Sequence, residues 1–268
     1  MNARAHLWVF AVLGLGVVTA CNRPATFAAR QAQAGAEAPD PGYRAAPQLT
    51  GMVKAADGGV TLTGRALPSS QVRMVSPAGA RIETRADGSG AWSAPIGPVS
   101  EPTLYRLAEE VGSQSNAQRV EAEGLVAVLP GAPIVALLRA GAGAEVQDSG
   151  GDAVKILAVD YDQAGGAVVS GRARAAAPVR VVIDGQLAIE GAAGAEGRFS
   201  LTLPKPIGPG RRQLQVLTPQ GMAEVEVVIS PPAPPKDAPY GAAAEASGWR
   251  IDWTTPGGGP QTTLLLGG

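Results

Sequence analysis

Few residues of this chain could carry covalent or catalytic chemistry. Cys21 is the only cysteine and His6 is the only histidine. A single cysteine cannot form a disulfide within the chain, so stability has to come from hydrophobic cores. Nucleophilic sites of the Ser-His-Asp and Cys-His types, and the usual zinc sites, need histidine or several thiols. The sequence therefore predicts no catalytic residue, no metal site and no cofactor.

Carboxylates are the remaining candidates for acid-base or metal chemistry. Asp160 and Asp162 are spaced by two and precede glycines, as at the start of a calcium loop. The twelfth position of that loop, where a glutamate ligand is expected, is Gly171, so a turn between strands is the preferred interpretation. Adjacent acids such as Glu109 and Glu110 fall where solvated charge is expected. Hydrolysis of glycans by carboxylates alone is kept as an alternative, although it needs two acids facing each other across a cleft.

Cys21 has a different expected chemistry. Residues 1–20 have the plan of an export signal, with a basic start, an apolar run and small residues at the end. Positions 18–21, Val-Thr-Ala-Cys, are similar to the bacterial lipobox, in which the cysteine is acylated and the signal, here with His6, is removed. Two or more acyl chains hold a protein stably on a membrane, whereas one does so marginally. The resemblance implies a lipidated Cys21; the alternative is an ordinary secretory or transmembrane start.

Residues 21–46 are expected to form a flexible tether behind the lipid anchor. They are rich in Ala, Gln, Pro and Arg and contain almost no large apolar side chain. Such a segment cannot bury enough surface to order itself. Asn22, not aspartate, follows the cysteine, and by analogy with enteric lipoproteins this favours the outer membrane.

An internal repeat organises the rest of the chain. Gly64-Arg65-Ala66 returns as Gly171-Arg172-Ala173, and residues 59–93 match residues 166–200 at 12 of 35 positions without a gap. The matched segments carry period-two apolar runs bounded by Pro, Gly, Ser and Asp, which are strand and turn signals. Each copy ends in a turn followed by one aromatic residue, a ring expected to fill a sandwich core. The sequence therefore predicts two copies of one β-module.

The first copy resembles a known family of modules. Val-Thr-Leu-Thr-Gly-Arg-Ala over 60–66, Val-Arg-Met-Val over 72–75 and Asp-Gly-Ser-Gly-Ala-Trp-Ser over 87–93 resemble the immunoglobulin-like (Ig-like) modules of bacterial envelope and surface proteins. The resemblance implies an all-β fold of two tandem antiparallel Ig-like β-sandwiches, over 47–130 and 152–230. It also implies an adhesive, spacing or docking use.

Residues 131–151 are predicted to connect the two modules. Residues 134–138 are apolar enough for a buried strand, whereas the glycine-rich stretches 141–144 and 149–151 have the composition of hinges.

The first module is expected to close with a hairpin. Its strands would flank the polar loop 112–116, which is either a solvated turn or a contact surface. A short helix over 104–111 is the alternative to the first of these strands.

Residues 231–268 combine a proline-rich spacer with a C-terminal strand segment. Trp249, Ile251 and Trp253 would share one face of a strand. An isolated strand or hairpin is marginal in water, so the segment must dock. It either pairs with a sheet edge of its own chain or adds to a sheet of a partner, and in the second case these three side chains are the partner-binding residues.

The composition narrows the classes of function. The formal net charge is −1 and the charges are spread along the chain, so no basic stripe indicates nucleic acid. Aromatic residues make up 4% of the chain, which gives no support for peptidoglycan or glycan binding on stacked rings. The prediction is a noncatalytic lipoprotein, anchored to the outer membrane through Cys21, that binds or scaffolds another envelope protein through its Ig-like modules and C-terminal strand. A passive spacer or adhesin is the second hypothesis.

Overall fold

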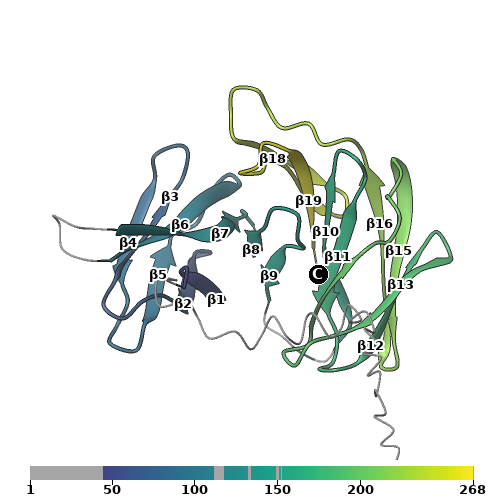
Figure 1. Cartoon of the computed structure of the whole chain (residues 1–268), viewed down its shortest axis with the longest axis horizontal. Helices are drawn as coiled ribbons and strands as arrows, with labels where there is room; N and C mark the ends of the chain where they lie inside the picture. The colour runs from purple at the N-terminus through teal and green to yellow at the C-terminus, as the bar shows by residue number, and fades with distance from the viewer. Residues whose placement is uncertain (1–44, 112–117, 132–133, 149–150, 152, 268) are drawn as a thin grey trace, which may run out of the picture. The chain divides into compact units, whose positions relative to one another are not determined.

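The computed structural model describes residues 45–111, 118–131, 134–148, 151 and 153–267, and these ranges contain strands but no helix (Figure 1). Accordingly, no membrane-spanning helix occurs in these ranges. The predicted all-β class is confirmed. Cys21 and the 112–116 loop lie outside the described residues.

The first sandwich is built from two antiparallel sheets. Sheet A has the order β1-β2-β5, and sheet B has the order β4-β3-β6-β7-β8-β9. The strands are β1 (Gln48–Lys54), β2 (Val60–Arg65), β3 (Gln71–Val75), β4 (Arg81–Arg85), β5 (Ala91–Ile96), β6 (Thr103–Val111), β7 (Gln118–Val128), β8 (Val135–Leu138) and β9 (Glu145–Gln147). Their alternating apolar residues enclose a core that includes Leu62, Met74, Trp92, Leu107 and Val126.

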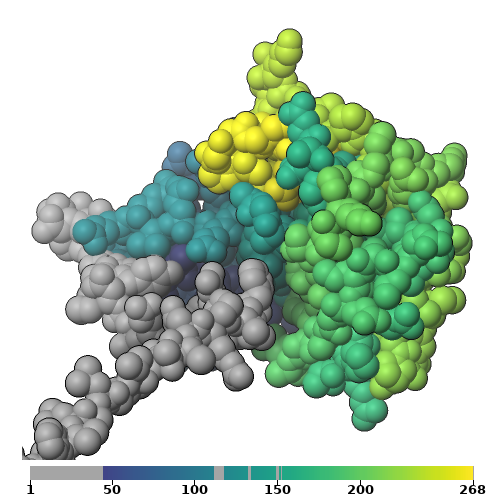
Figure 2. All heavy atoms as spheres, turned by 45° about the vertical axis from the view of Figure 1, so that its right-hand side comes forward, coloured from purple at the N-terminus to yellow at the C-terminus, as the bar shows by residue number. Residues whose placement is uncertain are grey.

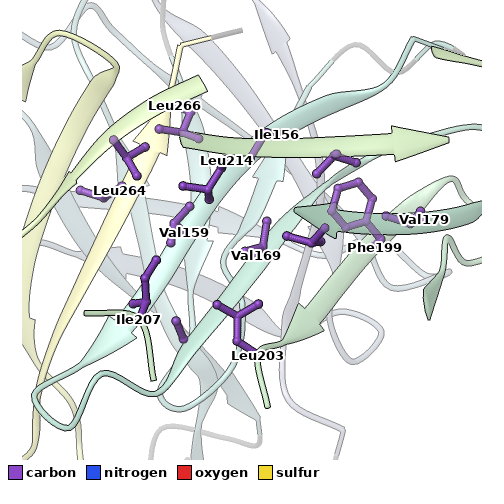
Figure 3. Close-up of a cluster of buried hydrophobic side chains, with 14 of the residues drawn as sticks. Ile156, Val159, Val169, Val179, Phe199, Leu203, Ile207, Leu214, Leu264 and Leu266 are labelled. Atoms are coloured by element: carbon purple, nitrogen blue, oxygen red, sulfur yellow. The ribbon is translucent and has the colours of Figure 1, made fainter. Parts of the chain in front are cut away.

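The second sandwich repeats this plan and extends it. Sheet C has the order β14-β11-β10-β19-β18-β17, and sheet D has the order β13-β12-β15-β16. The strands are β10 (Lys155–Asp162), β11 (Ala167–Arg172), β12 (Pro178–Ile183), β13 (Gln186–Ala192), β14 (Arg198–Thr202), β15 (Gly210–Thr218), β16 (Gly221–Ile229), β17 (Tyr240–Glu245), β18 (Gly248–Thr254) and β19 (Pro260–Leu266). Leu264 and Leu266 of the last strand lie in its core with Val159, Phe199 and Leu214 (Figure 3).

The repeat detected in the sequence is also a repeat of structure. Strands β1, β2, β3, β5 and β6 begin 107 residues before β10, β11, β12, β14 and β15 respectively. Even an irregularity is shared, because the ladder shifts register between Leu49 and Gly51 in the first module and between Ile156 and Ala158 in the second. The two sandwiches are therefore copies of one topology.

The glycine of the repeated tripeptide is required by packing. Gly64 pairs with Trp92 across β2 and β5, and a Cβ placed on it would lie 2.2 Å from the Trp92 ring. Gly171 pairs with Phe199 in the same way, and its Cβ would lie 2.5 Å from that ring. The aromatic side chain thus lies over the space that a side chain would occupy, which is why glycine is needed at this position.

The arginine and alanine of the tripeptide hold the turn before the aromatic residue. Arg65 Nη1 donates to the Ser89 carbonyl at 3.3 Å, and Arg172 Nη2 donates to the Glu196 carbonyl at 3.0 Å. The alanine N–H donates to a turn glycine in both copies. The most conspicuous motif of the sequence is therefore structural.

A third hydrophobic core joins the two sandwiches. Sheets B and C are buried on both faces where they meet: Val126 and Val128 of β7 point into the first sandwich, whereas Ala127 between them points toward sheet C. When both faces of a strand are buried, its sequence is a near-continuous apolar run and does not alternate with polar residues. We call this cluster the junction core; it consists of Leu104, Ala127, Leu129, Ala136, Leu138, Ala144, Val146, Leu157, Ala158, Ile251, Trp253 and Leu265.

Three expectations about connecting segments can now be compared with the structure. The predicted strand at 134–138 is β8, and residues 104–111 belong to strand β6, so the helical alternative was wrong. Within the predicted hinge 141–144, Gly143 and Ala144 are buried, so this half does not have the exposure expected of a hinge. A Cβ on Gly143 would lie 2.1 Å from the Ser170 hydroxyl, so glycine is needed there for close packing rather than for bending.

Candidate functional site: a groove beside the junction core

A groove of about 600 Å³ lies where the first module meets the C-terminal strands. Its floor is formed by β6 and β7, with the end of β3 at one side, and its wall by the start of β17, the end of β18 and the turn after it. In Figure 2 the yellow C-terminal residues border the teal surface of the first module in this region. The groove is therefore a composite of both modules.

The floor is apolar because it continues the junction core. Leu104 and Leu125 line the groove; Leu104 belongs to the junction core and Leu125 packs against it. Gly124 lies within β7 at φ 131°, and a Cβ on it would lie 2.1 Å from the Leu138 carbonyl oxygen. No larger residue fits there without a shift of the backbone, so this part of the floor carries no side chain.

The wall is fixed to the floor by hydrogen bonds. The Tyr240 hydroxyl donates to the Pro102 carbonyl at 3.1 Å and accepts from the Leu104 N–H at 3.4 Å. Trp253 is 1% exposed, and its indole N–H donates to the Thr263 hydroxyl at 3.3 Å. Aromatic side chains with a satisfied polar group thus form a rigid, largely apolar wall.

Two charged side chains line the groove, and neither has the setting of a catalytic group. Glu121 forms an ion pair with Arg119 at 3.1 Å. Arg106 is exposed and has no ion-pair partner among the described residues. Within the described ranges no cluster of three or more His, Cys, Asp or Glu side chains could hold a metal ion. The groove offers a ligand apolar contacts and the positive charge of Arg106. It does not place two acidic side chains facing each other across a cleft.

The three side chains predicted to bind a partner pack against other strands of the same chain. Strand β19 pairs with β10, and β18 pairs with β19, so the C-terminal segment completes sheet C of its own chain. Trp249, Ile251 and Trp253 do share one face, but Ile251 and Trp253 are 0% and 1% exposed and only Trp249 is half-buried. A contact with a partner through Ile251 or Trp253 would require the hairpin to leave both cores.

The two aspartates considered for calcium have separate structural tasks. Asp162 Oδ1 accepts from the N–H groups of Ala164 and Gly166, which is the turn that the sequence favoured. Asp160 is 2% exposed and joins the modules: its carboxylate accepts from the Ala144 N–H at 2.7 Å and from the Thr263 hydroxyl at 2.6 Å. Burial raises the pKa of Asp160 to about 6, although these hydrogen bonds act in the opposite direction.

Two further charged side chains are buried, and their burial was not predicted from the sequence. Arg250 is 8% exposed, forms an ion pair with Asp252 at 2.8 Å and donates to the Tyr161 hydroxyl at 2.8 Å. Glu109, treated above as solvated, is 0% exposed and accepts from the Leu67 N–H and the Ser70 hydroxyl, so that expectation was wrong. The alternation Trp-Arg-Ile-Asp-Trp places Arg250 and Asp252 on one face, but nothing in the sequence indicates that Glu109 is buried.

Comparison with known proteins does not identify a family for this chain. No family model matches the chain, and no curated protein matches it. Solved structures that are similar to parts of it include the following two. The BSP domain of a biofilm-associated protein is 11% identical, with 70% of this chain and 30% of that chain covered and a TM-score of 0.26. The central fibronectin-III array of RIM-binding protein is 14% identical, with 80% and 74% covered and a TM-score of 0.25. With TM-scores this low, the assignment of the fold rests on the strand order and register described above.

Proposed function

We propose that this protein is a noncatalytic scaffold of the bacterial outer membrane, anchored through a lipidated Cys21, that holds another component of the cell envelope in the groove between its two modules. The observation that carries the proposal is the junction core, because it makes a composite binding surface out of two sandwiches. A passive spacer needs no such surface.

The junction core is supported by polar contacts of fixed geometry. Gln261 donates to the Arg139 carbonyl at 3.1 Å and accepts from the Gly141 N–H at 3.1 Å. Asp160 binds the neighbouring Ala144 N–H. Directional bonds of this kind specify one arrangement of two apolar surfaces. A groove whose floor and wall come from different modules then keeps its shape before a ligand arrives, which lowers the cost of binding.

The expected anchor places the modules within reach of the membrane. Cys21 and the first described residue are separated by residues 22–44. A stretch of this length spans at most roughly 80 Å when fully extended. A protein in the same envelope layer could therefore be held near the bilayer without the modules themselves entering it.

The groove is tested by photo-crosslinking in a bacterium that exports and lipidates the full-length chain. A benzophenone side chain replaces Arg106 on the groove floor, and a matched variant carries it at Arg180, an exposed arginine on β12 of sheet D. The expected result is one envelope protein crosslinked from position 106 and absent from position 180. Equal crosslinking from both positions, or none from position 106, would contradict the proposal.

The anchor is tested separately. Cys21→Ser should abolish labelling by radioactive palmitate and move the protein out of the outer-membrane fraction of a density gradient. Unchanged fractionation of this variant would refute the lipid anchor while leaving the groove proposal intact.

A further inference from the structure

Strand β17 is the last strand of sheet C, and one of its edges has no partner strand among the described residues. Its register with β18 shows which backbone groups point to that edge. Thr254 N–H donates to the Pro239 carbonyl, one step beyond the Tyr240–Trp253 pair. Bonded and non-bonded pairs alternate in an antiparallel ladder. The N–H and C=O groups of Tyr240, Ala242 and Ala244 are therefore directed away from β18, toward the open edge.

This edge lacks the features that usually protect an edge strand. Natural edges carry lysines, prolines or bulges that prevent further pairing. The pairing of β17 with β18 is regular, and residues 242–244 are three exposed alanines. By contrast, the edge strand β4 carries Arg81, Glu83 and Arg85.

The proline-rich segment contacts β17 through Pro235, on the face that carries Gly241. A Cβ on Gly241 would lie 3.1 Å from Pro235. Successive residues of a strand point to opposite faces, so Tyr240 and Ala242 point to the other side. There Tyr240 is paired with Trp253 and Ala242 with Ile251, which places them on the face of sheet C that forms the junction core.

The start of β17 borders the groove, because Pro239 and Tyr240 line it, so a strand added along this edge would reach the groove floor. Sheet C ends at β17, whereas the facing sheet B continues, and its Leu104 and Leu125 line the groove. Every second side chain of the added strand would face this apolar floor. The open edge offers backbone N–H and C=O groups, and the floor beside it is apolar. An extended polypeptide can pair with the first and pack alternate side chains on the second, whereas a glycan has no apolar side chains at that spacing.

We propose that the groove receives an extended polypeptide segment, which adds to β17 as a further strand of sheet C. Its alternate apolar side chains pack on the floor, and an acidic side chain at one end binds Arg106. The outward groups of Tyr240 to Ala244 fit a segment of about five residues, roughly 17 Å long. This inference rests on the proposed function and names the chemical class of the partner.

The test uses the full-length chain in detergent and a defined probe, the capped fluorescent peptide Glu-Val-Thr-Val-Thr-Val. Ala242→Pro removes the outward N–H at the middle of the edge, and proline is tolerated on edge strands. Ala242→Ser is the matched control that keeps the N–H. Fluorescence anisotropy should show at least tenfold weaker binding to Ala242→Pro than to Ala242→Ser, with equal melting temperatures. Arg106→Glu should weaken binding of this probe and strengthen binding of the same peptide with lysine in place of glutamate.

Each other outcome contradicts a stated part of the proposal. Equal binding to the proline and serine variants, or absence of binding to the unmodified protein, overturns the strand addition. A dimer of the full chain that Ala242→Pro abolishes would show that the edge takes a second copy of this chain instead. If position 106 crosslinks an envelope protein whose capture is insensitive to Ala242→Pro, the strand addition fails while the proposed scaffold function stands.

Discussion

Replacing Asp160 with asparagine should remove a pH dependence from the stability of the two-module unit. Asp160 is buried where the turn around Ala144 meets β19, and burial raises its pKa from 3.8 to about 6. Because the folded state binds this proton more tightly than the unfolded chain does, the stabilisation is complete below pH 3.8. It is lost as the pH rises through about 6.

The size of the effect follows from the two pKa values. The difference between 3.8 and about 6 corresponds to about 3 kcal/mol of unfolding free energy. Roughly 2 kcal/mol of this falls between pH 4 and pH 7, a range in which urea unfolding can be measured. Asparagine has nearly the same shape, so it can still accept from the Ala144 N–H and can donate to the Thr263 hydroxyl.

The assay is urea unfolding followed by tryptophan fluorescence at a series of pH values. Subtracting the unfolding free energy of Asp160→Asn from that of the unmodified protein cancels the contribution of groups that the two share. The difference should favour the unmodified protein by about 2 kcal/mol more at pH 4 than at pH 7. Thr263→Val, which deletes a hydrogen bond to the carboxylate, should make the slope steeper. A flat difference, or one with the opposite sign, would refute the reasoning that desolvation outweighs the hydrogen bonds.

Three other changes test the packing of the modules. Gly171→Ala should cost about 1–3 kcal/mol of unfolding free energy, since its Cβ would lie 2.1 Å from a backbone carbonyl, whereas Gly97→Ala, with open space around it, should have little effect. Equal melting temperatures for these two variants would contradict the role assigned to the repeated glycine. Trp92→Phe should change the unfolding free energy by less than about 1 kcal/mol, because the buried indole N–H has no partner and the second module uses phenylalanine at this position, whereas Trp92→Ala should cost about 3–5 kcal/mol. A loss of several kcal/mol in Trp92→Phe, measured by urea unfolding, would show that the N–H is needed. A chain ending at Pro235 loses β17, β18 and β19 and exposes two cores, so it should aggregate on gel filtration and lose its cooperative melting transition. A monomer with unchanged melting would mean that the C-terminal strands are dispensable.

The candidate site could be predicted only in part. The tail was expected to need a docking surface, and the three residues Trp249, Ile251 and Trp253 were correctly placed on one face of a strand. The sequence could not show whether this face is buried in the chain or open to a partner. Alternation predicts which side chains share a face but not what covers that face. The groove itself forms between the strand pair β6 and β7 and the strand pair β17 and β18. These two pairs lie more than 100 residues apart in the chain. No local pattern encodes that contact.

The sequence by itself determined the repeated module and its strands, because these depend on residues close together in the chain and on a period of two. The tertiary structure decided which sheet edge the C-terminal strands complete and that the modules share a third core. The physical reason is that strand pairing uses backbone groups common to all residues, so the choice of partner is made by long-range burial. The Thr263–Asp160 hydrogen bond, which spans 103 residues, is one consequence of that choice.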